Sequence, residues 1–428
     1  MTIVVLLILA GVSISLIVDN NGIIKRSKDA RKQYGEAQAN EQEQMGDISE
    51  WIDEQTTGKV SEKVKSFKTV KDENTTINGE EGNSNNPTIP AGYVPINTDT
   101  SNWGDGSSAP TQDSVDHGLV IKDDSNNEWV WIPVPDVTVM CNIANETEKK
   151  LCGTSGEKAV KTKLYSKSEI ITGEKRTMPG TSAYSGSYRE PDLVADFDAN
   201  EEYYKTILGF DSKEKMAEAF VSDYNEMIES IKTYGGFYIG RYELSEAGVQ
   251  KNQPTLTKKN WYNLYNACKD TKLQASDKVK TDMIWGCQWD VTCNFIANKG
   301  EQKSITNSSS WGNYYNTSVK ADDGATEIKA SGTSSALNTG ITTFTMANNI
   351  YDLAGNCWEW TQEAETTDCR VSRGGLYDFN GSNDPVSVRG SLYPGNGNLN
   401  YVRFSSNFNN KVTLNSRAWA PEWRIIIK

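Results

Sequence analysis

The stretch Asn349–Trp360, NIYDLAGNCWEW, followed by RVSRGG at Arg370–Gly375, constrains the fold more than any other feature of the chain. Successive side chains on an extended strand point to opposite faces. We therefore expect Trp358 and Trp360 to pack into one core while Glu359 points the other way, as a structural or metal-binding carboxylate. The double glycine after the second segment's last arginine marks close backbone approach or positive φ. A buried strand with a turn explains the same pattern without a ligand.

Three aromatic segments upstream accompany this stretch. They are WVWIPVP at Trp129–Pro135, YGGFYIGRYE at Tyr234–Glu243 and MIWGCQWD at Met283–Asp290. Together with the central stretch, they resemble the formylglycine-generating-enzyme (sulfatase-modifying-factor) family. The resemblance implies an α+β domain with a fold similar to that of C-type lectins and with much irregular backbone. It does not settle activity, because fold and function separate readily.

The resemblance also implies a calcium site on the Gly-Asn turn of the central stretch. Asp352 and Glu359 would bind through side chains, and Gly355 and Cys357 through carbonyl oxygens. Calcium takes oxygen ligands of both kinds. A hydrogen-bonded turn without a metal is the alternative.

The chemistry of the family is not expected here. Members that oxidise a substrate cysteine bind copper through a cysteine pair after the Arg-Gly-Gly motif, and Phe379 and Asp384 stand at those places. Cu(I) prefers thiolates, and a phenyl ring cannot ligate it. The related iron sulfoxide synthases use a histidine cluster, whereas this chain has 1 histidine, His117, expected in an exposed loop. We expect no copper and no enzymatic activity; an enzyme with a rearranged site is the alternative.

The N-terminal run Met1–Val18 carries no charge. Its length approaches the ~20 residues of a membrane-spanning helix, although a buried soluble helix is the alternative. The run resembles the N-terminal helix of type IV pilin-like proteins of Gram-positive bacteria, which implies a cell-surface protein, anchored in the membrane or associated with a pilus, and self-assembly through that helix. The positive-inside rule would place the basic residues of Lys25–Lys32 in the cytoplasm, against this topology. We nevertheless expect the C-terminal part to lie outside the cell, where a lectin-like domain would meet its ligand.

Composition divides the chain into three parts. Residues 1–54 are predicted to be a membrane and stalk helix, because helix formers continue to Glu54 without proline. Residues 55–88 are predicted to be a linker, too polar to bury a core. Residues 89–428 form the predicted globular domain.

Apolar spacing predicts the elements of that domain. A strand covers Trp129–Val134, and a helix covers Lys213–Thr233, with Ser212 as its N-cap and Gly235-Gly236 as its end. The apolar stripe of this helix comprises Met216, Phe220, Tyr224, Met227, Ile228 and Ile231. Two more helices carry the stripes Trp261, Leu264, Tyr265, Cys268 and Trp289, Cys293, Ile296. The polar residues 174–198 and 299–340 are predicted to be loops.

The charge balance limits the classes of binding partner, and the cysteines limit the disulfides and metal sites that the chain can form. With 44 Lys and Arg against 57 Asp and Glu, the formal charge is −13, which argues against nucleic acid as a partner. The 7 cysteines are an odd number, so at least one is unpaired or pairs between chains. No CxxC occurs, so a zinc site is not expected. Cys141 and Cys152 are candidates for a local disulfide, whereas Cys268, Cys293 and Cys357 lie among apolar neighbours and are expected to be buried.

The segment Leu376–Pro421 is the predicted ligand-binding face. Asn supplies adaptable hydrogen bonds, while Tyr, Trp and Arg supply anchoring area. The candidate residues are Tyr377, Asp378, Asn380, Asn383, Arg389, Tyr393, Asn396, Asn398, Asn400, Tyr401, Arg403, Asn407, Asn409, Arg417 and Trp419. The segment resembles the variable region of diversity-generating retroelement proteins, which implies variation at its Asn and Tyr positions. A set of solvated Asn-rich loops is the alternative.

Three functions fit these observations. The first is a surface-displayed binding or adhesion module whose ligand is a protein or a glycan. The second is a pilin-like filament subunit that the globular domain merely decorates. The third is an oxidoreductase of the sulfatase-modifying-factor family with a rearranged site. The absence of the family's cysteine pair favours the first.

Overall fold

The computed structural model describes residues 71–137 (except 72, 97, 99–102 and 104–108), 194–256, 259–366, 369–392, 404–405 and 412–417. All of them belong to one compact unit that begins at Val64. The predicted membrane and stalk helix of residues 1–54 lies outside the described residues. Among the helices that are described, none has the length and apolar character needed to cross a bilayer.

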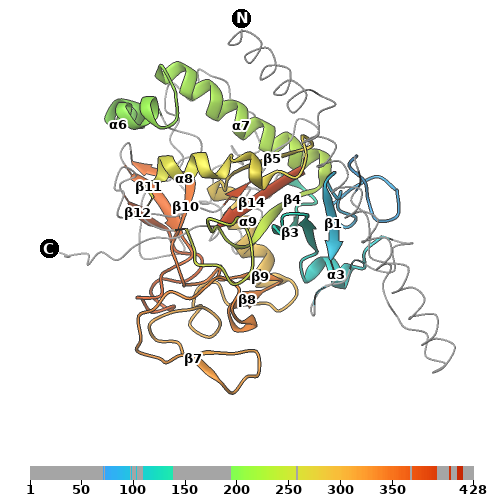
Figure 1. Ribbon diagram of the computed structural model, residues 1–428, viewed down its shortest axis with the longest axis vertical. Helices are drawn as coiled ribbons and strands as arrows, with labels where there is room; N and C mark the ends of the chain where they lie inside the picture. Colours follow the sequence, from blue (N-terminus) through green and yellow to red (C-terminus); the bar gives the residue numbers. More distant parts are fainter. Residues whose placement is uncertain are drawn as a thin grey trace, which may run out of the picture. The chain divides into compact units, whose positions relative to one another are not determined.

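The unit is a mixed α/β structure built on a seven-stranded sheet (Figure 1). From edge to edge its strands are β1 (Tyr93–Ile96), β2 (Val120–Asp123), β3 (Glu128–Pro133), β4 (Gly236–Glu243), β14 (Val412–Arg417), β5 (Val279–Met283) and β13 (Phe404–Ser405). The first four strands form antiparallel pairs, whereas β14 runs parallel to both β4 and β5. A strand from near the C-terminus thus fills the middle of a sheet made by earlier segments.

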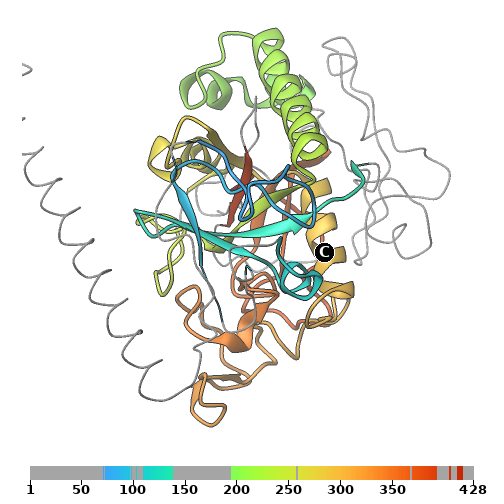
Figure 2. The same cartoon turned by 90° about the vertical axis from the view of Figure 1, so that its right-hand side faces the viewer.

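Helices pack on this sheet. The described helices are α3 (Gln112–Asp116), α6 (Val194–Thr206), α7 (Lys213–Tyr234), α8 (Trp261–Cys268) and α9 (Gly286–Asn298), with short 3₁₀ turns η3 (Thr271–Leu273) and η4 (Thr343–Thr345). The long α7 contacts β4 and β14, α8 contacts β5, and α9 contacts β3 (Figure 2). All 8 residues of β4 are buried, as expected for a central strand that is covered on both faces.

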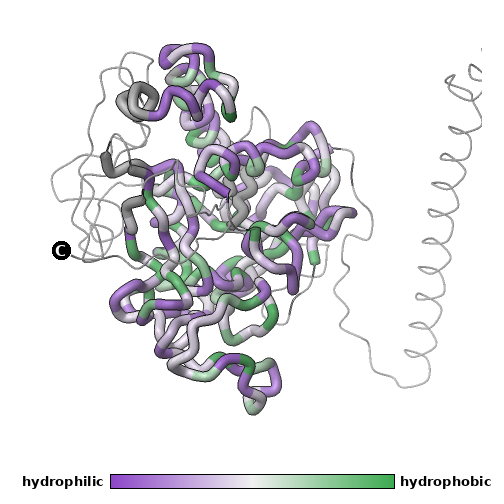
Figure 3. Tube along the Cα trace, turned by 60° about the vertical axis from the view of Figure 1, so that its left-hand side comes forward, coloured by the Kyte–Doolittle hydropathy of each residue, from purple (hydrophilic) through white to green (hydrophobic). Residues whose placement is uncertain are grey.

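Smaller sheets extend the unit beyond the main sheet. One joins β10 (Glu359–Thr366), β11 (Cys369–Arg373) and β12 (Gly390–Leu392). Two-stranded pairs join β6 (Val319–Lys320) to β7 (Glu327–Lys329) and β8 (Met346–Ala347) to β9 (Ile350–Tyr351). The loop-rich part around β7 is coloured mostly white and purple in Figure 3, as its polar composition predicts.

The three helices predicted for the globular domain are confirmed, and so are the predicted ends of α7. The side chain of Ser212 accepts a hydrogen bond from Lys215 N at the start of α7, and Gly235 ends the helix in the left-handed region at φ 75°. The predicted stripe of α7 is buried in one hydrophobic core, as are the stripes of α8 and α9. Capping and 3.6-residue periodicity are local signals, so the sequence alone reveals them.

Other expectations differ from the structure. The predicted loop 174–198 is interrupted, because α6 begins at Val194. Part of the predicted linker packs on the domain: Thr75 pairs with Ile89, and Ile77 is buried in the core. His117 is not in an open loop but caps the C-terminus of α3, with its side chain 27% exposed.

A charged cluster fastens α7 to the neighbouring elements. Asp223 of α7 forms ion pairs with Lys280 of β5 at 2.5 Å and with Lys269 after α8. Burial opposes the ionisation of Asp223, but the two lysines outweigh it and lower its pKa to about 2. Burial dominates at the adjacent Asp282 and raises its pKa to about 7.

The end of α7 generates a first prediction. A Cβ on Gly235 would lie 2.4 Å from Ser84 N, so Gly235→Ala combines an unfavourable positive φ with a backbone clash. We expect the free energy of unfolding to fall by about 2 kcal/mol or more, measured by urea denaturation. Gly209 is the matched control, since its φ is 74° and a Cβ added there would meet no atom within 4 Å. Equal losses in Gly235→Ala and Gly209→Ala would contradict the close approach of Ser84.

Candidate functional site

Unusual backbone conformations explain the composition of the central stretch. Asn349, Asp352, Gly355 and Asn356 all have positive φ, at 64°, 53°, 70° and 54°. Asn, Asp and Gly adopt this region most readily. The Asn349 side chain also donates to the carbonyls of His117 and Gly118 at 3.1 and 2.9 Å, so it fixes the end of α3.

Asn356 connects the stretch to strand β4. Its Nδ2 donates to Glu243 Oε2 at 2.6 Å and its Oδ1 accepts from Asn313 Nδ2 at 2.8 Å. Glu243 Oε2 also accepts from Thr255 Oγ1 at 2.7 Å. All of these groups except Thr255 are fully buried, so the Gly-Asn turn is held by a polar network inside the protein rather than by solvent.

The two tryptophans around Glu359 are buried as expected, but so is Glu359 itself, at 0% exposure. Both faces of this strand therefore meet protein. Of the four predicted calcium-binding residues, Asp352 is also fully buried, and its Oδ2 accepts from Gly340 N at 2.8 Å and Thr339 Oγ1 at 3.1 Å. In the described part of the chain, no three His, Cys, Asp or Glu side chains are grouped closely enough to hold a metal. Calcium on this turn would therefore depend on carbonyl oxygens and water for most of its ligands.

The Arg-Gly-Gly motif provides the close approach that its glycines predict. Gly374 and Gly375 have φ of 95° and 85°. The Gly374 carbonyl accepts from Gly355 N at 2.7 Å and from the Tyr314 hydroxyl at 3.1 Å. A Cβ on Gly375 would lie 2.2 Å from the carbonyl oxygen of Asp384, so the motif fixes the loop that follows.

Four fully buried charges, which we call the buried charge ring, lie beside this motif. Arg373 pairs with Asp290 at 2.7 Å and with Glu363 at 3.3 Å. Arg389 pairs with Glu363 at 2.9 Å and also with Asp290. Each acid thus bridges both arginines, and all four side chains have 0% exposure. The ring joins α9, β10, β11 and the segment before β12.

The two positions that the family resemblance assigns to copper-binding cysteines contact one tryptophan. Phe379 stacks on Trp358 with ring centroids 5.4 Å apart. Asp384 Oδ2 accepts from Trp358 Nε1 at 2.6 Å and from Leu376 N at 3.1 Å. Burial raises the pKa of Asp384 to about 7, although these two hydrogen bonds favour the ionised form. A ring and a carboxyl group therefore fix the indole from two sides.

The loop Leu376–Asp384 exposes a row of polar side chains between buried ends. Asp378, Asn380, Ser382 and Asn383 are exposed, whereas Leu376, Tyr377 and Asp384 are buried. Two backbone hydrogen bonds hold this loop on the segment 308–315: Tyr315 N donates to Phe379 O at 2.9 Å, and Ser308 N donates to Gly381 O at 2.8 Å.

The predicted ligand-binding residues are only partly brought together. Asp378, Asn380 and Asn383 share the exposed loop, with Tyr377 buried at its base. Arg389 does not lie on this surface, because it belongs to the buried charge ring. Arg417 ends the central strand β14, opposite Glu243 of β4. The remaining candidates lie outside the described residues: Tyr393, Asn396, Asn398, Asn400, Tyr401, Arg403, Asn407, Asn409 and Trp419.

The cysteines whose side chains the structure describes lie in the core. Cys268, Cys293 and Cys357 are buried, as predicted, and so is Cys287. Burial raises the pKa of Cys293 to about 12 and also raises that of Cys268 well above its usual value, so neither is a thiolate at neutral pH. The candidate disulfide between Cys141 and Cys152 lies outside the described residues.

The sequence analysis missed Asp290, Glu363 and Glu243. The sequence carries no local signal for the first two, because Arg373 and Arg389 each stand beside a glycine and need acidic partners only once they are buried in the folded structure. Comparison with protein-family models, with curated proteins and with solved structures finds no match for the chain. The site is therefore interpreted from its own geometry.

The buried charge ring generates a second prediction. Arg389→Met leaves two carboxylates with one cation, so we expect the free energy of unfolding to fall by about 3–5 kcal/mol. Denaturant titration measures the loss. The control Lys215→Met removes an exposed ion pair with Asp211 and should change the stability by no measurable amount. In a double-mutant cycle with Glu363→Gln, the two losses should not add, and additivity would contradict a direct interaction.

Asp384 generates a third prediction. The pKa of Asp384 is raised to about 7 in the folded protein, from a value near 4 in the unfolded chain. At any pH between about 4 and about 7, the folded state therefore binds the proton of Asp384 more tightly than the unfolded state does. The free energy of unfolding should therefore fall as pH rises from about 4 to about 7, by at most about 1.4 kcal/mol per pH unit, and then level off. Asp384→Asn keeps an oxygen acceptor for Trp358 but does not titrate. The measured quantity is the stability difference between wild type and Asp384→Asn across this range; a difference independent of pH would contradict the assignment.

Proposed function

We propose that the chain is a binding protein displayed at the cell surface, an adhesion module rather than an enzyme. Its ligand, a protein or a glycan, is held by the loop Leu376–Asp384 and by the segment that follows to Pro421. The folded unit is a C-type-lectin-like domain of the formylglycine-generating-enzyme type, behind a polar linker and a pilin-like membrane helix at residues 1–54.

One observation carries this proposal: an exposed polar loop is fixed on a rigid buried frame. Asp378, Asn380 and Asn383 face solvent, while Asp384 and the glycine pair of residues 374–375 fix the loop ends. A preordered loop loses less conformational entropy when it binds a partner. Exposed Asn and Asp side chains offer donors and acceptors without contributing to the core.

The packing at Trp358 supports a binding role over oxidation chemistry. Phe379 and Asp384 occupy the positions of the family's copper ligands, and both are engaged with the tryptophan ring. Neither supplies the thiolate that Cu(I) requires. The third of the three functions, an oxidoreductase with a rearranged site, would need a different set of ligands.

A filament subunit remains the second candidate. Self-assembly would require the N-terminal helix, whereas ligand binding would require the loop. The two functions are therefore compatible and can be tested separately. Deleting Met1–Val18 should release the protein from the membrane fraction and abolish assembly without affecting ligand capture. Capture that depends on the N-terminal run would favour the filament function.

Calcium binding generates a fourth prediction. If calcium binds only the native state, at the turn of Asp352 and Glu359, millimolar calcium should raise the melting temperature relative to a chelator. Glu359→Gln should remove this response. A melting temperature indifferent to calcium in the wild type would exclude the site.

The exposed loop generates a fifth prediction. The triple variant Asp378→Ala, Asn380→Ala, Asn383→Ala should abolish capture of ligand on an array of surface proteins and of glycans larger than a disaccharide, without a measurable loss of stability, because the three side chains are exposed. Tyr393→Ala, Tyr401→Ala and Trp419→Ala together should have the same effect.

The matched control for this test changes exposed residues of the same types elsewhere. Asp124→Ala with Asn263→Ala should leave capture unchanged, since both residues lie outside the loop and are exposed. Unchanged capture in the triple variant, or equal loss in the control, would move the binding site away from the loop.

A further inference from the structure

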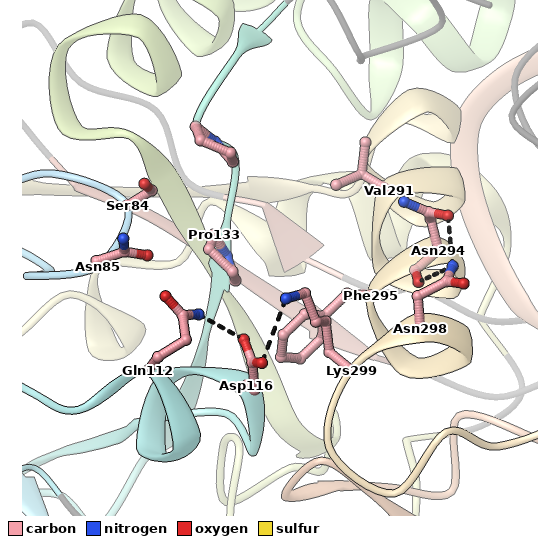
Figure 4. Close-up of a pocket in the computed structure, with 11 residues that line it drawn as sticks. Ser84, Asn85, Gln112, Asp116, Pro133, Val291, Asn294, Phe295, Asn298 and Lys299 are labelled. Atoms are coloured by element: carbon pink, nitrogen blue, oxygen red, sulfur yellow. Dashed lines mark hydrogen bonds and ion pairs between the residues drawn. The ribbon is translucent and has the colours of Figure 1, made fainter. Parts of the chain in front are cut away.

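A cavity of about 400 Å³ lies between α3, the end of β3 and α9 (Figure 4). None of its lining residues belongs to the loop Leu376–Asp384 or to the segment after it. Its size lies within the range of small-molecule binding sites. The proposed function makes no use of it.

The walls of the cavity are fixed by buried groups. The indole of Trp131 donates to Ser84 O at 3.0 Å, which holds the turn that forms one wall. Gly235 permits the backbone of this turn to pack against the end of α7. On another wall, Asn349 fixes the end of α3 through the carbonyls of His117 and Gly118. The cavity is therefore preformed and needs no rearrangement to accept a ligand.

The charges that line the cavity neutralise each other. Lys299 Nζ lies 3.2 Å from Asp116 Oδ2, and Gln112 Nε2 donates to Asp116 Oδ1 at 2.7 Å. Lys299 is the single cation and Asp116 the single anion among the described lining residues. A charged ligand would meet no unpaired counter-charge there, so the lining favours a neutral ligand.

Carboxamide groups supply most of the polar lining. They belong to Asn85, Gln112, Asn294 and Asn298. Asn298 Nδ2 donates to Asn294 Oδ1 at 2.8 Å, and this bond orients Asn294 with its amide nitrogen toward the cavity (Figure 4). Each carboxamide offers donors and an acceptor side by side. That combination matches hydroxyl groups, which both donate and accept.

Apolar groups complete the lining. Val291 and Phe295 on α9 face Pro133 across the cavity (Figure 4), and Pro135 also lines it. We propose that the cavity binds a neutral saccharide of one or two units. Ring hydroxyl groups would bond to the carboxamides, and the C–H face of the sugar ring would lie on the apolar side chains.

The lining is less suited to an extended peptide. Strand β3 borders the cavity at Pro133, which already pairs with Gly236 of β4 on one side. Pro133 and Pro135 also lack the N–H groups that an added strand would bond to. A peptide would therefore lose the main-chain pairing on which strand addition depends.

The test uses the full chain and small neutral sugars. Glucose, galactose, mannose, N-acetylglucosamine, lactose and maltose are titrated by calorimetry, and at least one should bind. Asn294→Leu and Gln112→Ala should each weaken that binding about tenfold, as expected for one lost hydrogen bond. The control Asn263→Ala, an exposed carboxamide on α8, should bind as the wild type does. The loop variant Asp378→Ala, Asn380→Ala, Asn383→Ala should also retain binding of these small sugars. The proposal for the cavity is therefore tested independently of the proposal for the loop.

Three results would overturn the proposal. One is the absence of binding by every sugar in the panel. Another is tighter binding of a capped dipeptide, N-acetyl-Ala-Ala-amide, than of any sugar. The third is sugar binding that Gln112→Ala leaves unchanged; this variant decides the matter even if Asn294→Leu does not fold, because Gln112 is exposed on α3.

Discussion

The buried charge ring is the interaction on which the rest of the unit depends. Arg373 and Arg389 are fully enclosed, and each would be strongly destabilising without its two carboxylate partners, Asp290 and Glu363. The partners come from segments far apart in the chain; Arg389 and Asp290 are 99 residues apart. Because each acid pairs with both arginines, the cluster links α9 to β10, to β11 and to the residue that precedes β12.

The ring determines where the exposed loop lies. Arg373 directly precedes the two glycines, and its Nε donates to Val388 O at 2.7 Å. The loop between Arg373 and Val388 therefore leaves and re-enters the core at fixed positions. Within it, Asp384 accepts a hydrogen bond from Trp358 and holds the loop against this side chain. Order in the loop therefore derives from buried contacts rather than from its own exposed side chains. Changes at Asn380 or Asn383 alter the surface without altering the frame.

The sequence predicted the elements whose signals are local. The caps of α7, the apolar stripes of three helices and the positive φ at the glycine pair all follow from neighbouring residues. It did not predict the partners of buried polar groups, since Asp290 and Glu363 acquire their roles only through tertiary contact. Strand β14 was also missed, because residues 412–417 were interpreted by their composition as part of a binding face. Yet VTLNSR alternates apolar and polar residues at Val412 and Leu414, the pattern of a strand.

The position of β14 constrains how far the predicted binding face can extend. Val412–Arg417 pairs on both sides, with β4 and with β5, so its backbone belongs to the centre of the sheet. Variation there would disturb two ladders at once, whereas variation in the loop Leu376–Asp384 would disturb none. If the C-terminal segment binds through changeable side chains, those changes are expected between the regular strands and not within β14. The frame and the binding surface would then alternate along one segment of the chain, with the same buried contacts holding both in place.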